Sequence, residues 1–131
     1  DVGGDHPLVA VLVEDPAGAQ VKSTPGTSIY HFDGARQALA FARKLRDTLA
    51  AQGVQLRVGI DVGRVLLFEL GPGLRDVAGS PVNVAAKLAQ DAGVFGVIHL
   101  TAAAARQAGL PDVTAARAVR VGGVTIEAVA V

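Results

Sequence analysis

The chain contains no cysteine, no tryptophan and no methionine, and only 4% of its residues are aromatic. Without cysteine the chain can form neither disulfides nor thiolate metal sites. Cysteine usage therefore does not indicate whether the protein works in an oxidising or a reducing compartment. Hydrophobic residues make up 50% of the chain, yet no apolar run approaches the ~20 residues of a membrane-spanning helix. We therefore expect no membrane span and a core built from alanine, valine and leucine.

The chain also lacks an excess of charge of either sign. Twelve lysines and arginines balance twelve aspartates and glutamates, so the formal net charge is zero. No overall basic field exists to attract nucleic acid, and we expect no nucleic-acid partner. We interpret residues 1–131 as one domain excised from a larger protein. A composition rich in alanine, glycine, valine and arginine suggests a bacterial, cytoplasmic origin.

Hydrophobic patterning predicts strands and helices that alternate along the chain. Strands are expected at 8–13, 28–32, 55–62, 64–70, 97–100, 116–121 and 124–131, and helices at 33–52, 80–93 and 101–109. Residues 17–27 are expected to form a loop or at most a short edge strand, and 71–79 a glycine-rich loop. The two strands of 55–70 are expected to be joined tightly at Gly63, and the last two strands to form a hairpin around Gly122 and Gly123. This order predicts an α+β sheet with helices mainly on one face.

Several residues mark where these helices begin and which side they bury. Asp33, Ser80 and Thr101 are placed to cap helix N-termini, and Gly53 and Gly109 to end helices. The first helix is expected to bury residues that recur at helical spacing, namely Ala35, Ala38, Leu39, Ala42, Leu45 and Leu49. The second is expected to bury Val82, Ala85, Leu88 and Ala89.

The second helix also carries a polar pair. Asn83 and Lys87 lie four positions apart, so they share a face that differs from the buried one. An amide and a cation that point the same way can hold a phosphorylated ligand. The alternative is that both side chains are simply solvated.

Two linked motifs follow one another in the middle of the chain. Residues 56–65 read LRVGIDVGRV, and residues 76–88 read DVAGSPVNVAAKL. They resemble the patterns L-R-x-G-I-x-x-G-x-V and D-x-x-G-x-x-V-N-x-A-x-R-L of the catalytic domains of class III nucleotide cyclases, the adenylate and guanylate cyclase family. The resemblance covers nearly the whole chain and implies a ferredoxin-like, palm-type sheet.

One interval departs from the family, which inserts two helices between its first two strands. Only a loop is expected in that interval here, so the first helix pair is deleted. A short loop joins antiparallel neighbours, whereas a parallel crossover needs a dozen or more residues. We therefore predict that strands 8–13 and 28–32 pair directly. In the family the missing helices cover the substrate pocket and part of the dimer interface.

The resemblance implies a two-metal site that is only half present. The family holds two divalent cations with two carboxylates. VLVED at 11–15 places Asp15 at the first position, and KSTPGTSIYHF at 22–32 places Gly26 where the second aspartate belongs. Glu14 points to the opposite side of a strand and is not expected to substitute. We expect no cofactor, and Mg²⁺ or Mn²⁺ only if a site survives.

The resemblance also implies roles for residues around the nucleotide. Lys22 and Asp76 match the pair that recognises adenine, although each is equally a loop cation or a turn carboxylate. Asn83 matches the asparagine that orients the ribose. Lys87 stands where the family has arginine, so it keeps the charge and loses the planar fork. Val121 stands where a basic residue grips the terminal phosphates.

These departures predict a degenerate, catalytically inactive adenylate cyclase-like domain. It would act in signalling as a regulatory, dimerisation or protein-interaction module, with a second copy or other domains of its parent protein as partner. One alternative is a weak or non-standard adenylate cyclase that converts ATP to cyclic AMP and pyrophosphate. Another is a nucleotide sensor that binds without turnover.

Overall fold

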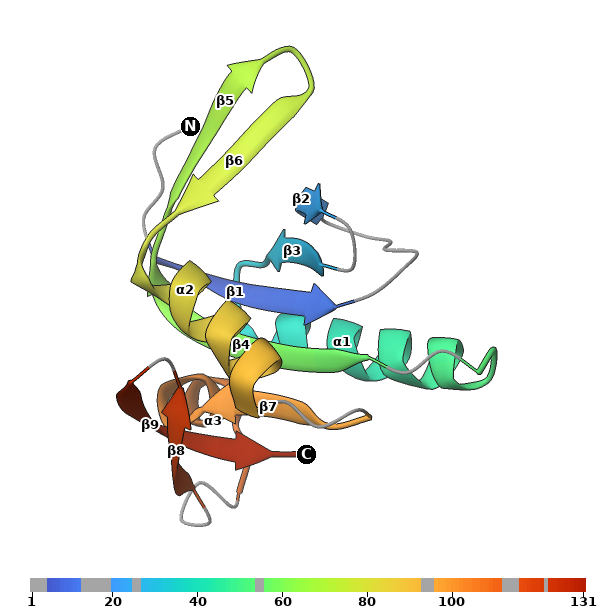
Figure 1. The fold of residues 1–131 in the computed structure, drawn as a ribbon, viewed down its shortest axis with the longest axis vertical. Helices are drawn as coiled ribbons and strands as arrows, with labels where there is room; N and C mark the ends of the chain where they lie inside the picture. The colour runs from blue at the N-terminus through green and yellow to red at the C-terminus, as the bar shows by residue number, and fades with distance from the viewer. Residues whose placement is uncertain are drawn as a thin grey trace.

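The computed structural model describes residues 5–12, 20–24, 27–53, 56–92, 96–111, 116–121 and 123–131 (Figure 1). A seven-stranded sheet has the order β2-β3-β1-β4-β7-β9-β8, and β5 and β6 form a separate hairpin. The strands are β1 (Asp5–Leu12), β2 (Gln20–Thr24), β3 (Thr27–His31), β4 (Arg57–Arg64), β5 (Leu66–Gly71), β6 (Leu74–Ala78), β7 (Ile98–Thr101), β8 (Arg117–Val121) and β9 (Val124–Ala130). The helices are α1 (Ala35–Ala50), α2 (Ser80–Lys87) and α3 (Ala102–Ala108), and a π-helix, η1 (Leu88–Ala92), continues α2.

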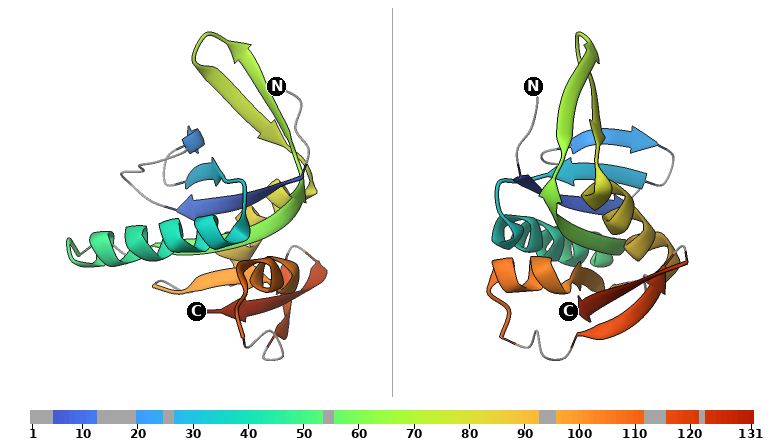
Figure 2. Two further views of the ribbon diagram at one scale, coloured as in Figure 1. Left: turned by 180° about the vertical axis from the view of Figure 1, so that it is seen from behind. Right: turned by 90° about the vertical axis from the view of Figure 1, so that its left-hand side faces the viewer.

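The predicted α+β fold, with helices mainly on one face, is confirmed. Helices α1 and α3 cover one side of the sheet, and α2 lies on the other (Figure 2). Val58 and Ile60 of β4 join the core cluster beneath α1, whereas Gly59 between them faces α2. This follows from the alternation of side chains along a strand. All six residues predicted for the buried face of α1 are buried.

The predicted direct pairing of the first two expected strands is also confirmed. β1 and β3 are antiparallel, with Leu8 opposite His31 and Val11 opposite Ser28. Between them the described residues form the edge strand β2, which pairs with β3, in place of a helix pair. The loop predicted for 17–27 therefore contains the short edge strand that was its alternative.

The region around Gly63 and the glycine-rich segment differ from expectation. Gly63 lies inside β4, which ends at Arg64, and β5 begins at Leu66. The tight turn predicted at Gly63 is wrong, because this glycine instead makes room for Pro81, which a Cβ would meet at 2.7 Å. The loop predicted for 71–79 is wrong as well, since β6 pairs with β5 as an antiparallel hairpin.

Two of the three predicted N-caps are wrong. Gly34 rather than Asp33 is the N-cap of α1, where the amide of Ala35 donates to Gln107 Oε1 of α3 at 2.8 Å. Gly79 rather than Ser80 is the N-cap of α2, at φ 141°, a conformation that glycine accommodates.

The third helix and the last hairpin follow the prediction. The hydroxyl of Thr101 accepts from the amide of Ala104, and Gly109 ends α3 in the left-handed conformation. Strands β8 and β9 form the expected closing hairpin. No helix in the described part of the chain combines the length and the hydropathy needed to span a bilayer.

The close approach of α2 to β4 gives a first testable prediction. A Cβ on Gly59 would clash with the backbone carbonyl of Ala85 and lie 3.0 Å from the amide nitrogen of Ala89. Because both atoms belong to helix backbone, Gly59→Ala must displace α2 or η1. We expect a loss of about 3 kcal/mol in unfolding free energy, measured by urea denaturation.

Gly71→Ala provides the matched control, since the nearest atom to its Cβ would be a leucine methyl 3.7 Å away. It should change the unfolding free energy by less than about 1 kcal/mol. Equal effects of the two substitutions would contradict the close contact.

Candidate functional site

Helix α2 carries the candidate site, and its seat on the sheet fixes where its polar face points. Pro81 lies against Gly63 and Ala85 against Gly59, so successive helix turns rest on two glycines of one strand. Ala85, Leu88 and Ala89 are buried as predicted, and Val82 is half-buried. The opposite face of the helix is therefore turned away from the sheet.

Asn83 and Lys87 occupy that outer face together. Both residues are exposed, as the four-residue spacing predicts. Within the described part of the chain, neither side chain forms a hydrogen bond or an ion pair. The amide and the cation thus lie next to each other on the solvent-exposed face of α2.

The two residues predicted to recognise adenine come from strands that lie against each other. Asp76 is half-buried on β6, opposite Phe68 of β5. Lys22 lies on the edge strand β2, opposite Ile29, and β2 contacts β6. The backbone thus brings the two positions to one side of the molecule, although the Lys22 side chain lies outside the described set.

The donor set does not fit the two-metal cage that the resemblance implies. Asp15 and Gly26 both lie outside the described residues, and glycine offers no side-chain ligand. A divalent-cation pair needs oxygen donors from at least two carboxylates to match the family's arrangement. Among the described residues, no group of three histidine, aspartate or glutamate side chains is placed to hold a metal ion.

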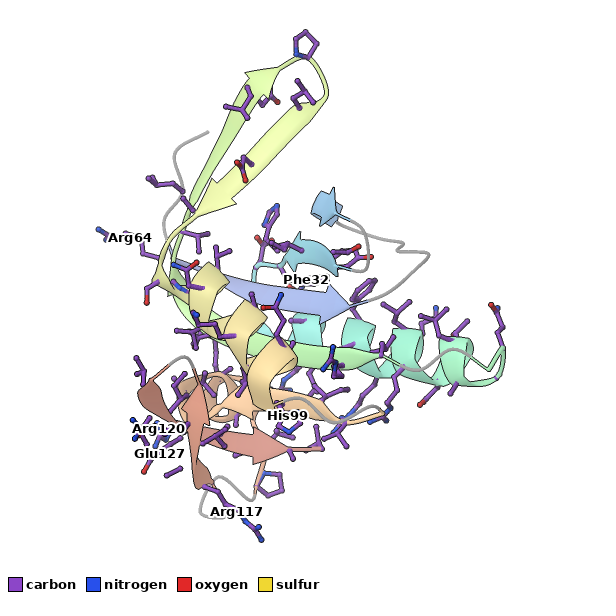
Figure 3. All side chains as sticks on the ribbon, in the orientation of Figure 1. Phe32, Arg64, His99, Arg117, Arg120 and Glu127 are labelled. Atoms are coloured by element: carbon purple, nitrogen blue, oxygen red, sulfur yellow. The ribbon has the colours of Figure 1, made fainter. Side chains whose placement is uncertain are left out.

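The closing hairpin places its arginines on different faces. Arg120 lies opposite Thr125 and Arg117 opposite Ala128. By alternation, Arg117 shares the face of Val121, whereas Arg120 points to the other side of the strand, as the sequence predicted. The two arginines lie apart along β8 (Figure 3). The side chain of Val121 lies outside the described set.

Asp61 is a titratable residue that the motif comparison did not single out. It lies on β4 between Gly59 and Gly63, on the face that α2 covers, and accepts a 2.7 Å hydrogen bond from the Thr101 hydroxyl. Burial raises the pKa of Asp61 above its usual value, and hydrogen bonds from Thr101 and from the Val62 backbone oppose that shift. No local sequence signal marks Asp61, because its hydrogen-bond partner lies 40 residues further along the chain and its burial comes from the assembled sheet.

This carboxyl makes stability depend on pH. Since the folded-state pKa is raised above 3.8, the folded chain binds the proton more tightly than the unfolded chain does. The stabilising contribution is complete below the unfolded pKa and is lost as the pH rises through the folded pKa. Asp61→Asn removes this loss, so the variant should gain unfolding free energy relative to wild type between pH 4 and pH 7.

Urea denaturation at the two pH values measures the difference, with Thr101→Ser as a control that retains the hydroxyl donor to Asp61. The control should keep the wild-type pH dependence. A gap between Asp61→Asn and wild type that is the same at both pH values would contradict the raised pKa.

Among known proteins, solved structures share the architecture of this chain. No protein-family model and no curated protein matches the chain. Among solved structures, it is similar to the catalytic core of a rhodopsin-guanylyl cyclase with converted specificity in complex with ATPαS. That match has a TM-score of 0.76 at 13% identity and covers 99% of this chain and 96% of the other.

Two further structures extend the similarity. The guanylate cyclase domain of RhGC from Catenaria anguillulae, in complex with GTP, matches with a TM-score of 0.73 at 13% identity, covering 97% of this chain and 95% of that one. An adenylate/guanylate cyclase/hydrolase from Silicibacter pomeroyi matches with a TM-score of 0.66 at 19% identity, covering 98% and 96%. The chain therefore has the fold of a class III adenylate/guanylate cyclase catalytic domain.

Proposed function

We propose that this chain is a degenerate adenylate cyclase-like domain that has lost catalysis and serves as a regulatory and dimerisation module of a larger signalling protein in the bacterial cytoplasm. The observation that carries the proposal is Gly26, which stands where the family's second metal carboxylate belongs. The cyclase fold supports the origin of the domain. The altered charges support the loss of turnover.

The energetic argument rests on three changed positions. Gly26 removes a carboxylate, Lys87 replaces a forked cation with a point charge, and Val121 removes the cation of the closing hairpin. Removing a single charge-stabilising group typically costs a hundredfold or more in rate, about 3 kcal/mol. Several such losses in one site leave little turnover.

A second candidate function rests on what the fold retains. Asn83 and Lys87 stand together on the exposed face of α2, and the contact between β2 and β6 keeps Lys22 and Asp76 on neighbouring strands. These groups are the ones that would hold a ribose and a base. They favour either a weak cyclase or a sensor that binds a nucleotide without converting it.

A cyclase assay separates these functions. We expect no cyclic nucleotide above background when the purified chain is incubated with ATP or GTP and Mn²⁺, because the second carboxylate is missing. Calorimetry with ATP, GTP and cyclic nucleotides should give flat titrations. A heat of binding at millimolar ligand would instead support the sensor.

Production of cyclic AMP that Asp15→Asn abolishes would overturn the proposal in favour of the weak cyclase. In that case Gly26→Asp combined with Lys87→Arg should raise the rate tenfold or more, on the order of 1.4 kcal/mol or above. Lys44→Arg on the exposed face of α1 is the matched control, and it should leave the rate unchanged.

The β5–β6 hairpin supports the dimerisation part of the proposal. It projects from the body of the molecule (Figure 1), and its Leu66, Leu70 and Leu74 are among the large apolar side chains that the structure describes as exposed. Leu70 is 66% exposed and Leu74 61%. Gathered apolar side chains of this kind are typical of protein–protein contact surfaces.

We expect Leu70→Glu combined with Leu74→Glu to weaken self-association at least tenfold, measured by sedimentation equilibrium, because charges would then be buried in the contact. Val124→Glu is the control, since Val124 is also 61% exposed but lies on the β8–β9 hairpin. Equal effects of the two variants, or a wild-type chain that stays monomeric, would count against the hairpin contact.

A further inference from the structure

Strand β8 is one edge of the seven-stranded sheet, and no described strand covers it. It stands last in the strand order, with β9 paired to one side of it (Figure 1). Among the described elements, η1 packs against one face of β8 through Leu88 and Val119. The opposite edge differs, because β2 contacts β6 of the projecting hairpin. The β8 edge is therefore open to pairing with a further strand.

The register of the closing hairpin decides which backbone groups of β8 face outward. Val121 pairs with Val124 across a two-residue connection, so these two residues bond to each other. Hydrogen-bonded and non-bonded pairs alternate along an antiparallel ladder. The odd-numbered residues of β8 thus direct their N–H and C=O groups toward β9. Ala118 and Arg120 direct theirs away from the sheet.

Two cations accompany these outward backbone groups. Arg117 and Arg120 are both exposed, and they lie on opposite faces of β8 and at different heights along it (Figure 3). Within the described part of the chain, neither arginine forms a hydrogen bond or an ion pair. Strand β8 itself contains no acidic residue. A strand that approaches this edge therefore meets positive charge on both of its faces.

The titratable groups behind the edge do not cancel that charge. Glu127 faces the same side as Arg120, but it stands on β9 opposite Ala118, one strand inside the edge. His99 of β7 lies two strands inside the edge and is only 8% exposed. Burial lowers the pKa of His99, so its imidazole is neutral near pH 7. The edge thus favours a partner of negative charge.

The positions of the two arginines set the spacing of the matching carboxylates. A strand beside β8 places one residue opposite Arg120 and, three positions along, another residue opposite Arg117. Opposite charges that face each other across neighbouring strands attract. No two acidic residues of the 131-residue chain stand three positions apart. The matching segment therefore belongs neither to these residues nor to a second copy of them.

We propose that β8 binds an extended acidic segment of a partner protein, which adds a strand to the sheet and places carboxylates three positions apart opposite Arg120 and Arg117. The outward backbone groups of Ala118 and Arg120 supply main-chain hydrogen bonds, and the two ion pairs select the partner. The surface is separate from the β5–β6 hairpin and from the outer face of α2. It depends neither on the proposed dimerisation nor on the proposed loss of catalysis.

The test is a titration of the full chain, labelled with ¹⁵N, with two capped octapeptides of equal composition. TTEVVETT carries its glutamates three positions apart, whereas TTEVEVTT carries them two apart, on one face of a strand. We expect TTEVVETT to bind at least threefold more tightly, because only it can reach both arginines. Hydrogen exchange at the amides of Ala118 and Arg120 should slow on binding, while the amide of Val119, which faces β9, should change little.

Charge reversal tests the ion pairs. Arg117→Glu combined with Arg120→Glu should abolish the binding of TTEVVETT and allow the binding of TTKVVKTT, which carries lysines instead. Arg43→Glu combined with Lys44→Glu is the matched control, because it changes the net charge equally on the exposed face of α1. The control should keep the wild-type affinity for TTEVVETT within twofold.

A backbone substitution tests the added strand. Ala118→Pro removes one outward N–H, which an edge strand tolerates, whereas Ala118→Ser keeps it. We expect the proline to weaken TTEVVETT at least tenfold and the serine less than twofold, with the ¹⁵N spectrum as the check that both variants fold. Equal binding of the two glutamate peptides, equal losses in the two charge-reversed variants, or no saturable shift at millimolar peptide would overturn the proposal. Self-association of the wild-type chain that TTEVVETT reverses would overturn it in favour of a second copy at this edge.

Discussion

The contact between α2 and β4 is the constraint on which the rest of the candidate site depends. A helix can lie this close to a strand only where the strand has no side chain on that face, and Gly59 and Gly63 provide two such positions. Because the helix is seated at two points, its rotation about its own axis is fixed. The outward direction of Asn83 and Lys87 is therefore a consequence of two glycines that lie beneath the helix.

The core elements could be predicted from the sequence because they depend on local periodicity. The six buried positions of α1, the cap at Thr101 and the stop at Gly109 are set by residues a few positions apart. The failures lie where tertiary contacts outweigh local preference. Gly71 and Gly73 suggested a long loop, yet Gly71 ends β5 and Gly73 lies in the two-residue turn of a hairpin whose strands pair over most of their length. Ser80 has the chemistry of a cap, but the close approach of Gly79 to the Arg64 carbonyl makes the glycine the capping residue.

The candidate site shows the same division. The positions of Asn83 and Lys87 could be predicted because their four-residue spacing places them on one face of α2, whereas Asp76 was expected in a loop and lies on strand β6. Asp61 and His99 could not, since what makes each notable is burial and a partner, or the lack of one, contributed by strands distant in sequence. Three-dimensional burial of a polar atom leaves no trace in a linear pattern. The motif thus predicts the exposed face of α2, whereas the buried titratable groups can be identified only in the folded sheet.

Strand β8 forms one edge of the seven-stranded sheet, and this edge affects how copies of the domain can associate. One side of β8 pairs with β9, and the sheet ends there, so its free backbone groups face outward. Arg117 and Arg120 are both exposed along that rim. Positive charges stacked against their own copies would repel, which discourages the edge-to-edge growth that leads to fibrils. The two arginines thus help to keep a domain with half its residues apolar from polymerising through its own sheet.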